Sequence, residues 1–326
     1  MGSAKINDEL KQTIQKRMQT GTPRFLFRVW HAESGGTVGL NTINRITPLR
    51  FRLNPTHSRN FFDNSIEDLA QTAEDHIQSG KIPEGTMYSS WTQSLPQALV
   101  WACIRLKTRS KHLHLCILDT RELSSAQVVL HTYAMRELLS EKISEWVDYE
   151  LLAYGPLEGP VYKAVPLNDI PKVDLERFYA GFCQNMLNPK VGEGFFKKGD
   201  AASLLSAASD IGRLFGEYSL PMQVHLLSCM SHTDINHATI VDALSGPTVP
   251  EEWLDDPDPT DLDVAGHTEA QRAAIILRDL AIRAHRRGLG VSTSGGRQDL
   301  QKSQELKRTH MLAGGVTPHP MIPKHV

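Results

Sequence analysis

The sequence predicts an α+β protein whose strands lie in its first half and whose helices dominate its second half. Short apolar or alternating segments at 25–29, 112–118 and 146–153 have the pattern of strands. Past Pro171 the apolar residues recur at helical spacing, in a stripe that contains Leu204, Leu205, Ala208, Ile211, Leu214 and Phe215. This change of period predicts a mixed region followed by a mostly α-helical C-terminal region.

The same patterns divide the chain into four parts. Residues 1–22 are expected to form a polar leading helix, and 23–170 a domain that carries the strands. Residues 171–288 form the helical region. Within it, 247–263 holds seven carboxylates and four prolines, a composition typical of a solvated linker rather than of an acidic docking peptide. Residues 289–326 are rich in glycine, serine and proline and are expected to be a disordered tail.

Several further elements follow from local signals. Residues 65–79 are predicted to be an amphipathic helix because Ser65 is followed three residues later by Asp68, as in a helix cap. Helices are also expected over 95–107, 133–142 and 268–287. The segment 161–165 is expected to pair with the strand at 146–153, across a turn at Gly155-Pro156.

Composition excludes several classes of function. The 326 residues carry a net charge of −2, which gives no general attraction to nucleic acid or to an anionic membrane. The N-terminal segment has no apolar core of a signal peptide, and no apolar run approaches the roughly 20 residues that cross a bilayer. We therefore expect an intracellular, cytoplasmic protein without a membrane partner. Its four cysteines have no CxxC spacing and are expected to be buried thiols.

Arg28 closes the apolar segment RFLFRVWH (24–31). If Phe25 and Phe27 are buried on one face of a strand, Arg28 points with Leu26 to the other face. Its planar fork of donors suits a phosphate or a carboxylate. Taken alone, an ion-paired surface arginine explains this residue better.

A cluster of hydroxyl residues, MYSSWTQS (87–94), precedes the helix at 95–107. Hydroxyls at this place commonly serve as helix caps. A functional interpretation is that one hydroxyl orients a catalytic carboxylate while neighbouring aromatic rings enclose a ligand. The residues concerned are Tyr88, Ser89, Ser90, Trp91, Thr92 and Ser94.

Asp148 and Glu150 are the sharpest feature of the sequence. Residues i and i+2 of a strand share a face, so both carboxylates project into one space. Two acids on one face of an otherwise apolar segment cost free energy unless they have a partner or a function. They could instead pair with arginines at an exposed sheet edge.

Together these segments resemble the motifs of the ADP-ribosyltransferase superfamily, namely an arginine, a serine-threonine-serine cluster and an acid-x-glutamate pair. Arg28, Ser90-Trp91-Thr92 and Asp148-x-Glu150 carry the resemblance, which covers 23–166. The pattern from LFRVWH to YELLAYG further resembles an uncharacterised domain that is common in filamentous fungi. The resemblance implies a split β-sandwich of ADP-ribosyltransferase type that grips NAD as substrate.

The resemblance also implies roles for these residues. Arg28 would hold a phosphate or ribose of NAD, with Tyr88, Ser89, Trp91 and Thr92 in the cofactor-binding wall. Ser90, or Ser89 in the neighbouring register, would position Glu150. Glu150 would stabilise the oxocarbenium ion as nicotinamide leaves.

The same resemblance gives Asp148 the task of orienting the acceptor nucleophile. The sequence departs from the family pattern in two places. Trp91 stands in the middle of the hydroxyl cluster, and Asp148 is one methylene shorter than the usual glutamate or glutamine. The acceptor therefore stays open among arginine, another side chain, a nucleic-acid base and water.

Other site types find no support. The chain has no GxGxxG, phosphate loop or HExxH motif. His112 and His114 share a strand face but have no third ligand nearby, so no metal is predicted.

Two rival interpretations remain. One is an inactive interaction module of the same fold, with a protein partner on the helical region. The other is an unrelated intracellular α+β scaffold with ion-paired carboxylates.

Overall fold

The structure is a computed structural model of the whole chain. It describes residues 5–34, 38–78, 85–108, 110, 112–141, 143, 150–178, 200–230, 234–246, 249–260, 262 and 268–288. The expected tail at 289–326 lies outside the described residues, as does Asp148.

The described elements make a mixed α+β fold. In chain order they are α1 (Asp8–Gly21), β1 (Phe25–Trp30), β2 (Asn41–Thr42), β3 (Arg45–Ile46), α2 (Leu49–Leu53), α3 (Ile66–Gln78), β4 (Tyr88–Trp91), α4 (Leu95–Lys107), β5 (His114–Asp119), β6 (Val129–His131), α5 (Thr132–Leu138), β7 (Leu151–Tyr154), β8 (Leu157–Glu158), β9 (Tyr162–Pro166), α6 (Lys172–Phe178), α7 (Ala201–Arg213), α8 (Ser219–Ser228), α9 (His237–Leu244) and α10 (Thr268–Gly288). The mixed first half and the helical second half were both predicted.

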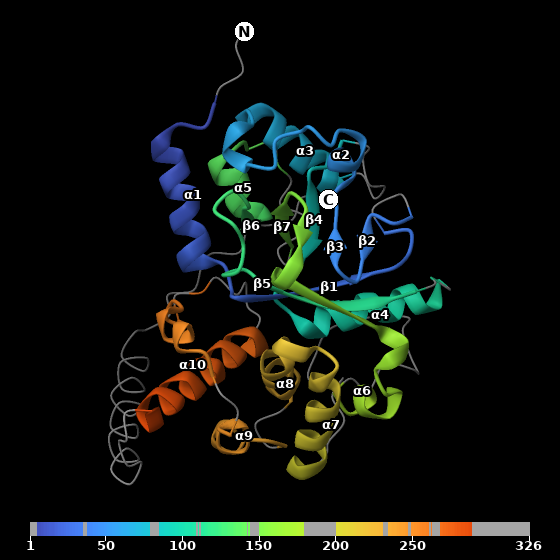
Figure 1. The fold of residues 1–326 in the computed structure, drawn as a ribbon, viewed down its shortest axis with the longest axis vertical. Coiled ribbons are helices and arrows are strands. Elements are labelled where there is room, and N and C mark those ends of the chain that lie inside the picture. Colours follow the sequence, from blue (N-terminus) through green and yellow to red (C-terminus); the bar gives the residue numbers. More distant parts are fainter. Residues whose placement is uncertain are drawn as a thin grey trace, which may run out of the picture.

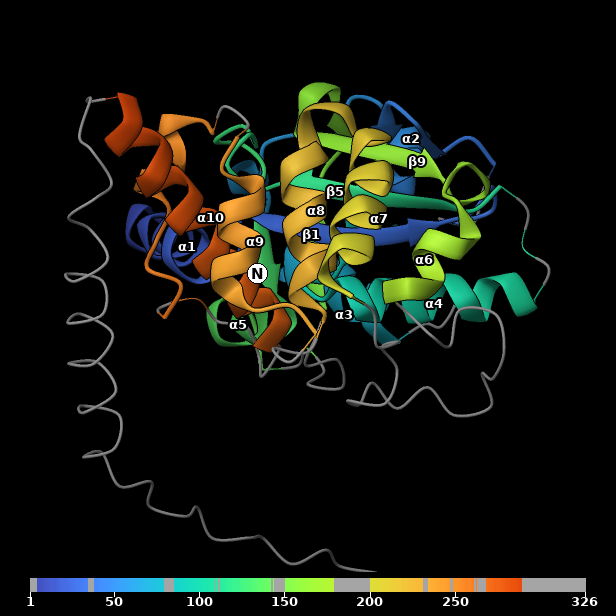
Figure 2. The ribbon, with the colours of Figure 1, turned by 90° about the horizontal axis from the view of Figure 1, so that it is seen from below.

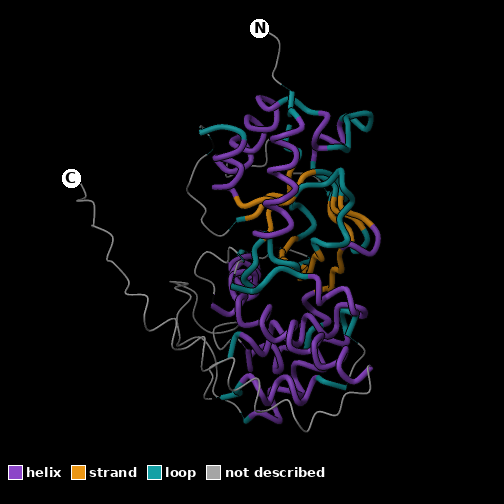
Figure 3. Tube along the Cα trace, turned by 90° about the vertical axis from the view of Figure 1, so that its left-hand side faces the viewer, coloured by secondary structure: helices purple, strands orange, loops and turns teal. Residues whose placement is uncertain are grey.

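Strands form a central layer between two groups of helices. Helices α1, α2, α3 and α5 lie on one side, and α6 to α10 on the other (Figures 1 and 3). Seen from the second side, α7 and α8 lie in front of β1 and β5 (Figure 2). The strands are therefore covered on both sides by helices from different parts of the sequence.

All strand pairing described is antiparallel and falls into three small sheets, ordered β1-β5-β9, β2-β3-β8 and β4-β7-β6. A bridge between Phe27 and Thr92 joins the first sheet to the third, with N···O distances of 2.7 and 2.9 Å. The hairpin predicted between 146–153 and 161–165 is wrong. β7 pairs with β4 and β6, whereas β9 pairs with β5. A turn such as Gly155-Pro156 reverses the chain without fixing which strand comes to lie alongside.

Successive side chains of β1 point to opposite faces of the strand, and each face packs into a different part of the core. Phe25 and Phe27 face the helical group, in one apolar cluster with residues of α4, α7, α8 and α10. Leu26 and Trp30 face the opposite way, into a cluster shared by strands of all three sheets. The expectation that Phe25 and Phe27 share one buried face is confirmed.

The acidic segment at 247–263 is not simply a solvated linker. Glu251–Asp255 forms a 3-10 helix, η5, and Trp253 within it is only 6% exposed. The Trp253 ring packs edge-on against Phe25, with centroids 5.8 Å apart. The large apolar surface of this one tryptophan outweighs the polar composition around it.

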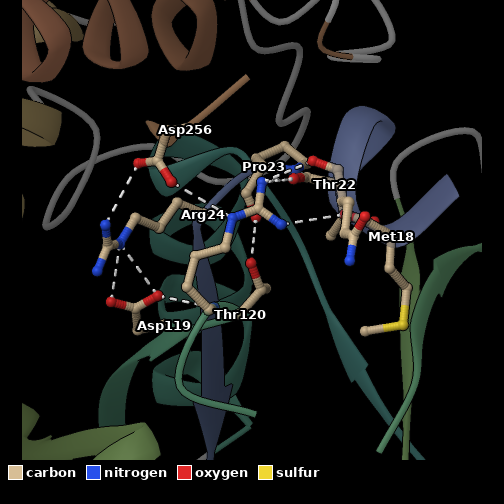
Figure 4. A network of polar contacts seen from close by, with 9 residues as sticks. Met18, Thr22, Pro23, Arg24, Asp119, Thr120 and Asp256 are labelled. Carbon is tan, nitrogen blue, oxygen red and sulfur yellow. Dashed lines mark hydrogen bonds and ion pairs between the residues drawn. The ribbon is translucent and has the colours of Figure 1, made fainter. Parts of the chain in front are cut away.

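A polar network fixes this segment to the strands (Figure 4). Arg24 and Asp119, whose side chains are 8% and 6% exposed, form an ion pair with an N···O distance of 2.9 Å. Asp256 contacts both Arg24 and Arg121, each at 3.4 Å. Arg121 also donates to the carbonyl of Met18 at 3.2 Å. Burial raises the pKa of Asp119, while Arg24 acts to lower it.

None of the helices in the described part of the chain combines the length and apolar character that a transmembrane span needs.

Candidate functional site

Three of the residues singled out in the sequence meet in the structure. Arg28 lies on β1, Ser90 on β4, and Glu150 directly before β7. The Arg28 guanidinium donates through Nη1 to the carbonyl oxygen of Ser90 at 2.9 Å. The Ser90 side chain and the Arg28 charge both act to lower the pKa of Glu150, so both lie near its carboxyl group. All three residues are half-buried, so each retains some contact with solvent.

The electrostatics of this cluster follow from partial burial. Desolvation raises the pKa of Glu150, and the Ser90 hydrogen bond and the Arg28 charge oppose that rise. Desolvation also lowers the pKa of Arg28, although Cys116, Glu150 and Tyr162 act to raise it. The Nε atom of Arg28 has no hydrogen-bond partner among the described residues. The guanidinium thus keeps a donor that the described part of the protein does not use.

His76 on α3 completes the cluster and was not predicted from the sequence. Its Nε2 lies 2.8 Å from Ser90 Oγ, and its Nδ1 lies 2.7 Å from Thr86 Oγ1. Burial, with help from the Arg28 charge, lowers the pKa of His76 to about 4. The imidazole is therefore neutral near pH 7 and carries one proton.

The direction of these hydrogen bonds follows from counting protons. If the single hydroxyl proton of Ser90 goes to the Glu150 carboxylate, Ser90 Oγ must accept from His76 Nε2. His76 Nδ1 is then an acceptor, and the hydroxyl of Thr86 donates to it. In that arrangement a chain of donors runs from Thr86 through His76 and Ser90 towards Glu150.

One sequence signal points to His76. Leu69, Ala73 and His76 follow one another at spacings of four and three, on one face of α3, and Leu69 and Ala73 are fully buried. A histidine that continues a buried apolar stripe needs a polar partner inside the protein. That signal cannot identify the partner, because Ser90 lies on another element.

The other hydroxyl and aromatic residues of the cluster have structural roles. Ser89 accepts a hydrogen bond from Trp91 Nε1 at 3.0 Å, and Tyr88 donates its hydroxyl to the carbonyl of Leu69 at 3.1 Å. Thr92 Oγ1 accepts from the amide of Ser94 at 3.1 Å. Residues 88–91 form the strand β4, so their hydroxyls do not cap a helix. The side chain that caps α4 is that of Ser94.

Tyr88 and Trp91, which are expected to enclose a ligand, are buried in the structure. Both side chains are 2% exposed. Trp91 lies in the apolar cluster between the sheets, and consecutive residues of a strand point to opposite faces, so its ring is on the other face from Ser90. The two rings therefore belong to two different apolar clusters of the core.

The remaining predicted positions are less informative. Asp148 lies outside the described residues, so its place relative to Glu150 is not described. His114 stacks on Trp30, with ring centroids 3.8 Å apart. Among the described residues no group of three or more histidine, cysteine, aspartate or glutamate side chains is arranged to hold a metal ion. The side chains of Cys103, Cys116 and Cys229 are buried.

Comparison with known proteins adds one match. None of the curated proteins and none of the solved structures matches the chain. Residues 21–166 match the family described as "Domain of unknown function (DUF7587)". That segment runs from the end of α1 to the end of β9, and it contains Arg28, His76, Ser90 and Glu150.

Proposed function

We propose that the domain at 23–166 cleaves NAD at its nicotinamide-ribose bond and transfers the ADP-ribosyl group to an acceptor or to water. The observation that carries the proposal is the convergence of Arg28 on β1, Ser90 on β4 and Glu150 directly before β7 into one cluster. The two larger sheets, with an apolar cluster between them, are also compatible with the split β-sandwich that the resemblance implies.

In this reaction the bond between ribose C1′ and the nicotinamide nitrogen breaks, and its electron pair leaves with neutral nicotinamide. Positive charge develops on the ribose. The Glu150 carboxylate, held by Ser90, stabilises that charge electrostatically. The acceptor then supplies an electron pair to C1′ and releases its proton. Where the acceptor is water, the products are ADP-ribose, nicotinamide and a proton.

Arg28 has two tasks in this scheme. Its guanidinium fixes β4 beside β1 through the Ser90 carbonyl, and its remaining donors suit a phosphate or a ribose oxygen of NAD. His76 acts as a positioning residue, because its Nε2 proton directs the hydroxyl of Ser90 towards Glu150. No metal is required, since the carboxylate supplies the opposing charge.

The test is nicotinamide release from NAD by the full chain. We expect release by the wild type, and its loss in Glu150→Gln with folding unchanged. Glu158→Gln is a matched control because that carboxylate is half-exposed and pairs with Arg59 on the surface. Release that survives in folded Glu150→Gln, or an absence of both NAD binding and release in the wild type, contradicts the proposal.

The second candidate is an inactive interaction module of the same fold. It is favoured by the bond between Arg28 and the Ser90 carbonyl, which already engages the guanidinium within the protein. A protein partner would then bind the helical region. This candidate predicts that the protein releases no nicotinamide, whether or not it binds NAD. It also predicts that Glu150→Gln has no effect on partner binding.

A further inference from the structure

A second site lies apart from Arg28 and Glu150, beside the strands β2, β3 and β8. It is a cavity of about 210 Å³, lined by Gly39, Arg45, Thr47, Phe51, Arg52, Pro55, Arg59 and Pro156. None of these residues belongs to the cluster around Ser90. The site therefore needs an explanation of its own.

The charges around this cavity are unbalanced. Three arginines line it, from β3, from α2 and from the loop that follows α2, and no carboxylate is among the lining residues. Arg59 pairs with Glu158 at 3.1 Å, but the side chains are 64% and 51% exposed, so that pair contributes little. Arg45 and Arg52 form no ion pair within the described part of the chain. At least two guanidinium groups thus remain available to an anion.

The hydroxyl of Thr47 is a second, independent sign of a missing partner. Thr47 lines the cavity, and its Oγ1 is buried without a hydrogen-bond partner among the described residues. A buried hydroxyl without a partner is costly, and native proteins seldom leave one so. Because Thr47 lines the cavity, rotation of its side chain about χ1 would turn this hydroxyl towards an anion oxygen bound there.

The walls favour a ligand that combines charge with a small apolar part. Phe51 is 6% exposed and Pro156 is buried, so they give the cavity an apolar side. Its volume of about 210 Å³ is below the roughly 300 Å³ at which pockets for drug-sized ligands begin. A whole dinucleotide does not fit, whereas a phosphate group with a small substituent does.

We propose that this cavity binds the phosphate group of a small phosphate monoester, or free phosphate, through Arg45, Arg52 and Thr47. Arginine suits this task because its planar fork can donate two parallel hydrogen bonds to phosphate oxygens. The proposal is independent of NAD cleavage, since the two sites share no lining residue.

The experiment is calorimetric titration of the full chain with three probes, namely inorganic phosphate, glycerol 3-phosphate and glycerol. We expect the two phosphate compounds to bind and glycerol not to bind. Tighter binding of glycerol 3-phosphate identifies an ester as the better ligand, and equal or tighter binding of phosphate identifies the free ion. Affinity should fall as salt rises, because the arginines lie near the surface.

Variants locate the site. Arg45→Gln and Arg52→Gln should each weaken phosphate binding about tenfold, the value of one charge-assisted hydrogen bond. Arg213→Gln is the matched control, because this exposed arginine lies on α7 and pairs with Asp210. Thr47→Val should weaken binding while leaving the ligand-free protein as stable as the wild type or more so.

Two results overturn the proposal. One is the absence of binding of either phosphate compound by the folded wild type. The other is binding that Arg45→Gln, Arg52→Gln and Thr47→Val leave unchanged, which would place the anion elsewhere. Nicotinamide release by the Arg45→Gln variant should equal that of the wild type, so that failure at one site does not imply failure at the other.

Discussion

His76 Nε2 lies 2.8 Å from the hydroxyl oxygen of Ser90, and this contact links a helix that carries no predicted site residue to the strand that carries the candidate serine. Because His76 also contacts Thr86, both ring nitrogens are engaged within the protein. Desolvation of the ring disfavours a second proton, and it lowers the pKa of His76 to about 4.

The first prediction concerns stability and pH. The pKa of His76 is about 4 in the folded protein against 6.5 for a free histidine. Between these values the unfolded chain binds more protons, so stability falls as pH decreases from about 6.5 towards 4. The contribution of neutral His76 to the free energy of unfolding is fully present above pH 6.5, and it amounts to at most about 3 kcal/mol. Urea unfolding at several pH values should show this slope in the wild type and a smaller slope in His76→Gln. Equal slopes would contradict the assignment.

The second prediction separates the two neighbouring serines. Ser90 lies near the Glu150 carboxyl group and acts to lower its pKa, whereas Ser89 accepts a hydrogen bond from Trp91 Nε1. If NAD is cleaved, Ser90→Ala should lower kcat at least tenfold, and it should also lower the melting temperature because His76 Nε2 loses its partner. Ser89→Ala should lower the melting temperature and leave kcat near the wild-type value. Nicotinamide release and thermal unfolding of both variants measure the difference, and a reversed pattern would move the candidate serine to position 89.

The third prediction concerns the buried pair of Arg24 and Asp119. Arg24→Met leaves the Asp119 carboxylate buried without its main partner, which should cost about 3–5 kcal/mol. Removing both charges in Arg24→Met/Asp119→Leu should cost less than that single change. Urea denaturation of the two single variants and the double variant tests this, with Arg59→Met as an exposed control. A double variant that loses the sum of both single costs would refute the coupling.

The fourth prediction tests whether the acidic segment belongs to the core. Trp253→Ala should destabilise the protein by about 3–5 kcal/mol, since the ring is 6% exposed and packs against Phe25. A solvated linker would show no loss. Leu254→Ala, at a partly buried neighbour, should cost less. Chemical denaturation followed by circular dichroism provides the comparison.

The fifth prediction uses a glycine inside a helix. Alanine usually stabilises such a position by about 1 kcal/mol. At Gly212, however, an added Cβ would lie 2.6 Å from Cγ of Gln223 and 2.8 Å from the carbonyl oxygen of Ser219. Gly212→Ala should therefore destabilise the protein by about 1–3 kcal/mol, because α7 and α8 must separate. Gly21→Ala, whose nearest atom would be Arg17 Cδ at 3.7 Å, should be neutral or stabilising.

The sequence predicts those features that depend on near neighbours along the chain. The alternation of Phe25 and Phe27 against Leu26 and Arg28 predicts which face of β1 meets the core, and Ser65 predicts the cap of α3, where it accepts from the amide of Asp68 at 3.1 Å. Periodicity requires only local residues, and it also predicts the position of α4 and the change to helices beyond 171.

The features that the sequence does not predict depend on distant residues. Ser90 pairs with Leu152 across β4 and β7, and no local signal selects that partner over β9. His76 becomes part of the candidate site only because α3 packs near β4. Trp253 is surrounded in the sequence by acidic residues and prolines. The average composition of the segment is therefore polar, and it does not reveal that this one side chain is buried. Arg28, Ser90 and Glu150 were predicted as a group from their resemblance to a family motif, not from periodicity.

The face of β1 that carries Phe25 and Phe27 has a practical consequence for dissecting this protein. The family match ends at residue 166, yet Phe25 touches Tyr218, His225 and Trp253, and Phe27 touches His225, all beyond that end. A fragment cut at 166 would expose Phe25 and Phe27 to water and tend to aggregate. Assays on such a fragment would report its insolubility instead of its chemistry, so the helices at 201–288 should be kept in any preparation.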